Sequence, residues 1–331
     1  MTEVAMLEID RVSKHFATRV GPEGSGVRSL VAVDSVSLQV LDGEALGIVG
    51  ESGCGKTTLG RLMVNLTRPS KGTIQFAGEN IVDLTGSALR AFRSAVQIVF
   101  QDPFGSLNPR LRIGDSIGEP LLNRGWPRAQ IRQRVAEMLE AVGLSADVAG
   151  RYPHAFSGGQ RQRIGIARAL VVQPALLVCD EAVSALDVSV QAQILNLLAD
   201  MRREQAFTLV FISHNLGVIR FLCSRIAVMY LGRIVELAPE KSLFEAPRHP
   251  YTQALIAAIP QPDPTLHERG RPLPGEPPSP LSPPSGCHFR LRCPHATGEC
   301  AAQAPPLREL ASDHWVACHH PLVCTGRGTD T

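Results

Sequence analysis

The chain has 331 residues, 44% hydrophobic and 19% charged, a composition that predicts a globular protein with a sizeable core and two domains. A formal net charge of +2 argues against nucleic acid or a strongly anionic surface as a partner. No apolar run approaches the roughly 20 residues that cross a bilayer, and the N-terminus lacks the apolar core of a signal peptide. We therefore expect a soluble intracellular protein that reaches a membrane only through a partner.

The N-terminal part of the chain predicts short strands. Residues 7–12 alternate between apolar and polar side chains, and residues 36–40 and 73–76 form two further strand patterns. The glycine-rich, polar stretch at residues 20–30 predicts a loop. Phe16 follows the first strand, where its ring would either stack on an adenine base or cover the edge of the core.

A glycine-rich segment, GESGCGKTT, lies between a predicted buried strand at residues 45–49 and a predicted helix at residues 59–64. It matches the pattern G-x-x-x-x-G-K-[ST], whose backbone N–H groups cradle phosphates at a helix N-terminus. Lys56 would bind the β- and γ-phosphates, and the Thr57 hydroxyl would bind Mg²⁺. The predicted nucleotide-binding residues are Gly50, Glu51, Ser52, Gly53, Cys54, Gly55, Lys56, Thr57 and Thr58.

Three further predicted strands end in polar side chains. Residues 96–101 end in Gln101, which is either a turn residue or an amide that binds Mg²⁺ or orients water while sensing an adjacent domain. The apolar run at residues 175–179 ends in Asp180 and Glu181, and two carboxylates at a buried strand end are costly without a partner charge. We expect Asp180 to bind Mg²⁺ through water and Glu181 to act as general base. His214 follows the strand at residues 208–212, where we expect it to contact the γ-phosphate.

The middle of the chain predicts a helical insert. Apolar residues between 113 and 142 recur at helical spacing, and we assign them to core packing. The sequence FSGGQ then precedes a predicted helix at residues 161–170. Ser157 is either a simple N-cap or, with Gly158 and Gly159, part of a second anion site.

The C-terminal part contains a predicted hairpin at residues 226–237, a short helix at 251–259 and a proline-rich stretch at 260–284. Four of the eight cysteines follow, and in an intracellular chain they indicate a metal or free thiols rather than disulfides. Their spacing, C-x₅-C-x₆-C-x₁₇-C, matches neither common zinc sites nor the ferredoxin run, so the metal stays open. This quartet consists of Cys287, Cys293, Cys300 and Cys318, and Cys324 lies beyond it.

Taken together, the motifs GESGCGKTT, VFQDP, FSGGQRQR, LLVCDE and SALD, followed by Ser213-His214, resemble the nucleotide-binding subunit of an ABC transporter over roughly residues 7–237. The longer segments VFQDPFGSLNPR and HPYTQAL are similar to the oligopeptide/dipeptide importer ATPases, a group that includes nickel and glutathione systems. One departure is Ala182, where the family usually has proline, and we expect activity to survive it.

The resemblance implies an α/β fold: an ABC-type P-loop nucleotide-binding domain with a RecA-like mixed sheet, a helical subdomain and a small Cys-rich C-terminal extension. We place the nucleotide-binding domain at residues 1–240, with the helical subdomain at roughly 102–170. A linker at 241–286 and a Cys-rich region at 287–331 follow. The resemblance also implies a [4Fe–4S] cluster on the quartet, with zinc as the alternative.

The resemblance further implies an ATPase that energises peptide import. Two cassettes, more often different chains than identical ones, would sandwich ATP and Mg²⁺ head to tail. The signature residues Ser157, Gly158, Gly159 and Gln160 would then serve the partner's ATP, with Asp187 at the seam. Lys56, Gln101, Glu181 and His214 would be the catalytic residues.

The same resemblance places the protein on the cytoplasmic face of the inner or plasma membrane. Gln101 and the helical insert would contact two membrane permease subunits, and an extracytoplasmic binding protein would deliver the solute. The alternative hypotheses are an ABC ATPase for nickel or glutathione uptake, a soluble non-transport ABC ATPase, and a metal-dependent sensor with the ATPase as its switch. Cys54, inside the phosphate loop, would be oxidisable and could then block ATP binding.

Overall fold

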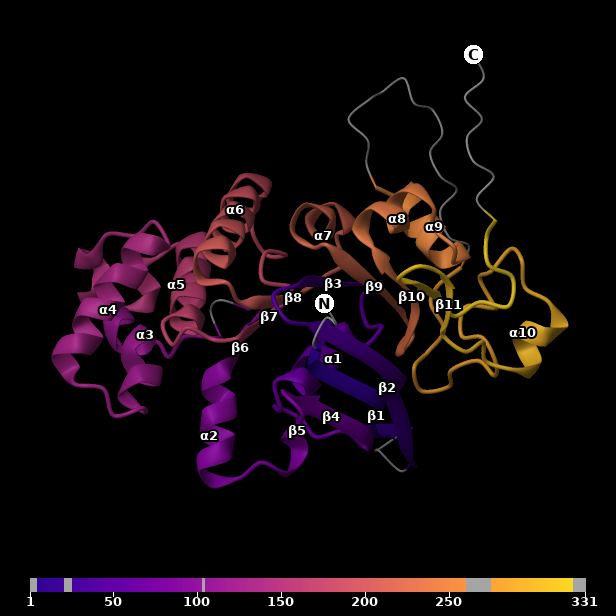
Figure 1. Cartoon of the computed structure of the whole chain (residues 1–331), viewed down its shortest axis with the longest axis horizontal. Helices are drawn as coiled ribbons and strands as arrows, with labels where there is room; N and C mark the ends of the chain where they lie inside the picture. Colours follow the sequence, from indigo (N-terminus) through magenta and orange to yellow (C-terminus); the bar gives the residue numbers. More distant parts are fainter. Residues whose placement is uncertain (1–4, 21–25, 103–104, 260–274, 324–331) are drawn as a thin grey trace, which may run out of the picture.

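The computed structural model describes residues 5–20, 26–102, 105–259 and 275–323. Two β-sheets form its frame (Figure 1). The described part of the smaller sheet has the order β2-β1-β4-β5, and that of the larger sheet β11-β12-β10-β9-β3-β8-β7-β6. A group of helices lies at one end of the molecule and the C-terminal region at the other (Figure 1).

The smaller sheet is antiparallel and is built on a long hairpin. Its strands are β1 (Ala5–Val20), β2 (Gly26–Leu41), β4 (Lys71–Phe76) and β5 (Glu79–Asn80). The loop predicted at residues 20–30 is therefore too long: β1 and β2 stay paired as far as Val20 opposite Gly26. Backbone hydrogen bonding across the hairpin overrides the weak strand propensity of the polar residues there. Residues 21–25 of that predicted loop lie outside the described part of the chain.

The larger sheet is parallel in its centre. Strands β3 (Ala45–Val49), β6 (Val96–Val99), β7 (Leu176–Asp180), β8 (Thr208–Ser213) and β9 (Arg225–Tyr230) run in the same direction. Strands β3, β7 and β8 are buried along their whole length, as their continuous apolar sequences predict. Parallel strands bring their carboxyl ends to one edge, so the segments after β3, β7 and β8 lie together.

Helices cover this sheet and form the insert. Helix α1 (Lys56–Met63) follows β3, and α2 (Gly86–Ala95) precedes β6. The predicted helical insert consists of α3 (Ile113–Leu122), α4 (Arg128–Ala141) and α5 (Gly158–Leu170), with short 3₁₀ turns between them. Gly118 allows α3 to approach α4 closely, because a Cβ there would lie 2.6 Å from Ile131.

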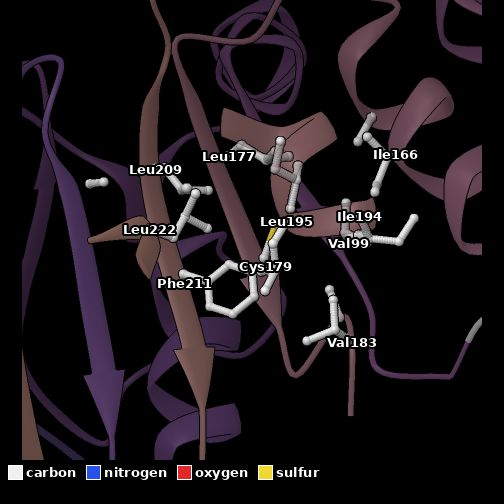
Figure 2. Packing of buried hydrophobic residues seen from close by; sticks show 14 of the residues in the cluster. Val99, Ile166, Leu177, Cys179, Val183, Ile194, Leu195, Leu209, Phe211 and Leu222 are labelled. Carbon is white, nitrogen blue, oxygen red and sulfur yellow. The ribbon is translucent and has the colours of Figure 1, made fainter. Parts of the chain in front are cut away.

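One core joins the sheet to the helices behind it. Phe211 and Cys179 from the strands pack with Leu195 of α6 (Val188–Gln205) and Leu222 of α7 (Leu216–Leu222) (Figure 2). The same core includes Phe289 of the C-terminal region. Among the described helices, none is both long and apolar enough to span a membrane.

The C-terminal region continues the larger sheet. Strand β10 (Arg233–Pro239) pairs with β9 and also with β12 (His314–Val316), which pairs in turn with β11 (Arg308–Ala311). The remaining short helices are α8 (Glu240–Glu245), α9 (Pro250–Ala257) and α10 (Gly298–Ala302), with a 3₁₀ turn at Ile81–Asp83.

A buried carboxyl group fastens this region to the sheet. Glu236 of β10 is fully buried and accepts hydrogen bonds from the backbone N–H groups of Arg248 and His249, at 2.7 and 3.0 Å. Its Oε1 also lies 2.7 Å from Nε2 of His314 in β12. His249 caps α9, where its Nδ1 accepts a hydrogen bond from the N–H of Tyr251 at 3.1 Å. One side chain thus joins the sheet, the start of α9 and β12.

Candidate functional site

The segment after β3 has the conformation of a phosphate-binding loop. Gly55 has φ +104°, and a Cβ there would lie 2.0 Å from the carbonyl oxygen of Ala32. Lys56 is 3% exposed, and its Nζ donates hydrogen bonds to the carbonyl oxygens of Gly50 and Glu51, at 2.8 and 2.9 Å. The glycines let the backbone curl, and the lysine is held over the loop where an anion would bind.

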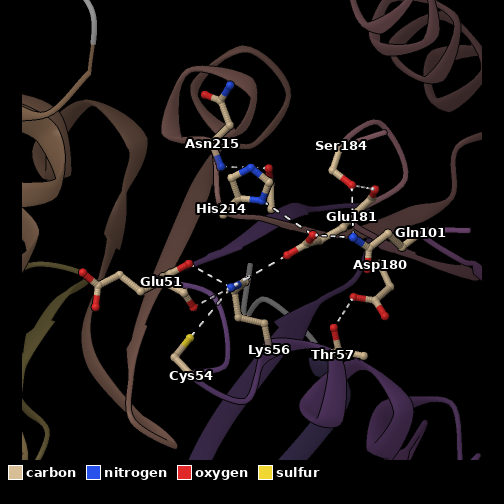
Figure 3. A network of polar contacts seen from close by, with 12 residues as sticks. Glu51, Cys54, Lys56, Thr57, Gln101, Asp180, Glu181, Ser184, His214 and Asn215 are labelled. Atoms are coloured by element: carbon tan, nitrogen blue, oxygen red, sulfur yellow. Dashed lines mark hydrogen bonds and ion pairs between the residues drawn. The ribbon is translucent and has the colours of Figure 1, made fainter. Parts of the chain in front are cut away.

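The first strand-end carboxyl group lies beside the threonine of this loop. The Thr57 hydroxyl donates a hydrogen bond to Oδ1 of Asp180 at 2.9 Å (Figure 3). Burial raises the pKa of Asp180, and the hydrogen bond from Thr57 opposes that shift. A hydroxyl and a buried carboxyl oxygen are the oxygen donors that Mg²⁺ prefers, so these two residues fit the predicted magnesium site.

The second carboxyl group, Glu181, lies between three other predicted site residues (Figure 3). Its Oε1 is 3.9 Å from Nζ of Lys56, and its Oε2 is 3.5 Å from Nδ1 of His214. Gln101 donates a hydrogen bond from Nε2 to Oε2 of Glu181 at 3.1 Å. The predicted catalytic residues therefore meet at one edge of the sheet, although they are up to 158 positions apart in the chain.

Glu181 adopts an uncommon backbone conformation. Its φ is +48°, in the left-handed region that non-glycine residues rarely occupy. Its N–H donates to the carbonyl oxygen of Ile212 in β8 at 3.0 Å, and its carbonyl oxygen accepts from the Ser184 hydroxyl at 3.0 Å. Such conformations persist where the surroundings hold them and are common at active sites. The turn aims the carboxyl group at the phosphate loop.

The FSGGQ segment forms a capped helix start. Ser157 caps α5 in a capping box with Gln160, a role that is compatible with the second anion site that stays a prediction. Gly159 lies against α6, since a Cβ there would be 2.5 Å from Cγ1 of Val190. Asp187 is exposed and caps α6 by accepting from the N–H of Val190 at 3.0 Å. None of these contacts tests the predicted role of the segment toward a partner's nucleotide.

Comparison with known proteins agrees with this geometry. Residues 33–184 match the family described as "ABC transporter", and residues 235–300 match the "Oligopeptide/dipeptide transporter, C-terminal region". The chain is 51% identical over 316 residues to the "Probable peptide ABC transporter ATP-binding protein y4tS" of Sinorhizobium fredii, with 95% of this chain and 90% of the relative covered. It is 47% identical to the "Oligopeptide transport ATP-binding protein OppF" of Escherichia coli, with 95% of each chain covered. The chain belongs to the ABC transporter ATP-binding subunits of the oligopeptide/dipeptide type.

The fold of this ABC subunit also matches solved cassettes. A dimeric, post-hydrolysis ATP-binding cassette, MJ0796 bound to ADP and Pi, aligns with a TM-score of 0.63 at 28% identity. That alignment covers 71% of this chain and 99% of the cassette. The ABC subunit is therefore an ATPase that uses ATP and Mg²⁺, and the expected fold class is confirmed.

Phe16 and Cys54 of this ABC subunit were both predicted to lie near the nucleotide, and their surroundings bear differently on the roles predicted for them. Phe16 is 40% exposed on β1, and Nζ of Lys14 lies 5.0 Å from its ring centroid. An exposed ring is available for stacking on a base, which favours the adenine interpretation over coverage of the core.

Cys54 is buried, and burial raises its thiol pKa, with the charge of Lys56 opposing. A raised pKa argues against oxidation of Cys54, because the reactive form is the thiolate, and the expectation stays a prediction.

The structure of the ABC subunit describes all four cysteines of the quartet, as free thiols. Burial raises the thiol pKa of Cys287, Cys293 and Cys318, and charge on neighbouring quartet thiols raises each further. The N–H of Cys287 also donates to the carbonyl oxygen of Cys300 at 2.8 Å. Yet no three His, Cys, Asp or Glu side chains within the described ranges form a group that could hold a metal ion. The expected cluster or zinc ion is therefore not shown, and Cys324 lies outside those ranges.

Sequence reasoning missed two residues that touch the phosphate loop of this ABC subunit. Tyr251 accepts a hydrogen bond at its hydroxyl from the N–H of Glu51, and Arg292 pairs with the Glu51 carboxylate. Tyr251 lies within the segment HPYTQAL, which already pointed to the family but carried no role. No local signal marks Arg292, since 241 positions separate it from Glu51.

Proposed function

We propose that this subunit hydrolyses ATP to energise the import of oligopeptides or dipeptides through a membrane ABC transporter. The observation that carries the proposal is the position of Glu181 between Lys56, Gln101 and His214, directly after the strand that ends in Asp180. The match of residues 235–300 to the oligopeptide/dipeptide transporter region, and relatives named for peptide transport, support peptides as the solute.

The residues divide the chemical work as follows. Lys56, now bonded to loop carbonyl oxygens, would bind the β- and γ-phosphate oxygens of ATP, and Thr57 and Asp180 would hold Mg²⁺. Bound Mg²⁺ neutralises charge on the phosphate oxygens. Glu181 takes a proton from a water molecule while the oxygen of that water attacks the γ-phosphorus. The bond from the γ-phosphorus to the β–γ bridging oxygen breaks, which leaves ADP and phosphate. Gln101 and His214 keep the carboxyl group in place.

Two cassettes complete the working unit in this proposal. The FSGGQ segment and Asp187 of one cassette would complete the nucleotide site of the other, and a heterodimer fits the family better than a homodimer. ATP closes the pair and hydrolysis reopens it, which drives the permease. The support is the dimeric form of the similar cassette and the exposed position of Asp187. Two permease subunits, bound near Gln101 and the helical insert, would hold the protein at the cytoplasmic face of the membrane.

The function is tested by deleting the gene from its host and measuring uptake of radiolabelled dipeptides, pentapeptides, glutathione and Ni²⁺. We expect loss of peptide uptake, restored by the wild-type gene and by Glu204→Gln, a control at an exposed position of α6. Glu181→Gln should fail to restore it. Intact peptide uptake with lost Ni²⁺ or glutathione uptake would favour the alternative solutes. Unchanged uptake of all four would favour a non-transport ATPase.

We also propose that the quartet binds a [4Fe–4S] cluster, with zinc as the alternative. The support is the family resemblance, together with the hydrogen bond from the N–H of Cys287 to the carbonyl oxygen of Cys300 at 2.8 Å, which brings two of the four cysteines together. Anaerobic purification followed by iron, sulfide and zinc analysis tests this. About four iron and four sulfide per chain, lost in Cys293→Ser, supports the cluster. Zinc alone selects the alternative, and absence of all three refutes both.

A further inference from the structure

The phosphate loop contains an acidic side chain that a residue of the cysteine-rich region neutralises. Glu51 is the second residue of GESGCGKTT, so its negative charge belongs to the loop that would receive a triphosphate. Arg292 donates from Nη1 to Oε2 at 2.8 Å and from Nη2 to Oε1 at 3.1 Å. The arginine is 6% exposed, and this two-pronged pairing fixes both the charge and the orientation of the carboxylate.

The loop is also held through its backbone. The N–H of Glu51 donates to the hydroxyl of Tyr251 at 2.9 Å, and the carbonyl oxygen of Glu51 accepts from Nζ of Lys56 at 2.9 Å. The rings of Tyr251 and Phe289 lie 5.4 Å apart between centroids, and Phe289 is buried between Cys287 and Cys293 in the sequence. A continuous path of contacts thus joins the cysteine-rich region to the phosphate-binding lysine.

We propose that Arg292 is a positioning residue for ATP binding: it neutralises and orients Glu51 and so links the cysteine-rich region to the phosphate loop. Without Arg292, the Glu51 carboxylate would add an unneutralised negative charge to the loop that receives the phosphates, and the backbone of the same residue is bonded to Nζ of Lys56 through its carbonyl oxygen. The proposal rests on the ATPase activity proposed above, and it concerns the affinity for ATP rather than the chemical step.

The test compares ATP KM, kcat and nucleotide Kd in Arg292→Met, Glu51→Gln and the double variant, with Arg290→Met as matched control. Arg290 lies in the same segment but donates to the carbonyl oxygen of Ser285. We expect Arg292→Met to raise KM and Kd at least about tenfold with kcat nearly unchanged, the pattern of lost uniform binding. Glu51→Gln in the same chain should restore most of the affinity, because it removes the repelling charge. Arg290→Met should behave as wild type.

Two results would overturn the proposal: an unchanged Kd in Arg292→Met, or a double variant as weak as the single one, which would indicate a merely structural role. Should Arg292→Met not fold, as judged by circular dichroism, Arg292→Gln takes its place, since it keeps a polar side chain at the site. Failure of the proposed function is separable, because wild-type protein would then hydrolyse no ATP or support no peptide uptake whatever the variants bind.

Discussion

Acid should weaken the attachment of the C-terminal region through one buried histidine. His249 is 1% exposed, and burial lowers its pKa from 6.5 to about 4, with Glu236 opposing the shift. Between these values the unfolded chain carries the proton and the folded chain does not, so stability falls as the pH drops from 6.5 toward 4. This difference in the pKa of His249 between the folded and unfolded chain corresponds to about 3 kcal/mol in the free energy of unfolding. About 2 kcal/mol of it is lost by pH 5.

Urea unfolding at pH 7, 6 and 5, followed by circular dichroism, measures this loss in wild type and His249→Asn. Asparagine can still accept the hydrogen bond from the N–H of Tyr251 at the start of α9, but it does not titrate. We expect the free energy of unfolding of wild type to fall by about 2 kcal/mol more than that of the variant between pH 7 and pH 5. Equal losses in the two proteins would refute the assignment of this proton uptake to His249.

Three further outcomes follow from the nucleotide site. Glu181→Gln should retain ATP binding but slow single-turnover hydrolysis by roughly 10² or more, and normal turnover would contradict its role as base. Lys56→Met should raise the ATP Kd at least about tenfold, about 1.4 kcal/mol, as measured by calorimetry; an unaltered Kd would exclude the lysine from phosphate binding. Gly159→Ala should destabilise the fold by about 1–3 kcal/mol, because its Cβ would lie 2.5 Å from Val190. An unchanged melting temperature in scanning calorimetry would show that Val190 rotates away without cost.

Most of the nucleotide site could be predicted because it is encoded locally. Each component follows a short apolar run, and a parallel sheet brings the ends of such strands together, so Lys56, Asp180 and His214 could be placed before any coordinates. The helical insert could also be predicted, since its apolar spacing matches its buried face. The positive φ at Glu181 could not be predicted, because no residue type signals it there.

Contacts between distant segments were beyond sequence reasoning. The pairing of β12 with β10 and the pairing of Arg292 with Glu51 each join positions at least 78 apart, and neither has a local pattern. The predicted loop at residues 20–30 failed for the related reason that strand pairing, rather than composition, decides where a hairpin ends. The metal expected at the quartet came from family resemblance, and no group of three potential ligands was found among the described side chains.

Strands β12 and β11 of the cysteine-rich region cover the edge strand β10 of the ATPase sheet. Strand β10 is almost wholly buried, whereas β11 exposes every residue and carries Arg308 and Glu309 at the outer edge. Charged, exposed outer strands discourage the edge-to-edge association that leads to aggregates. Removing the region would uncover the edge of β10, so we expect the truncated ABC subunit to associate through that edge more readily than the full chain, whatever the thiols bind.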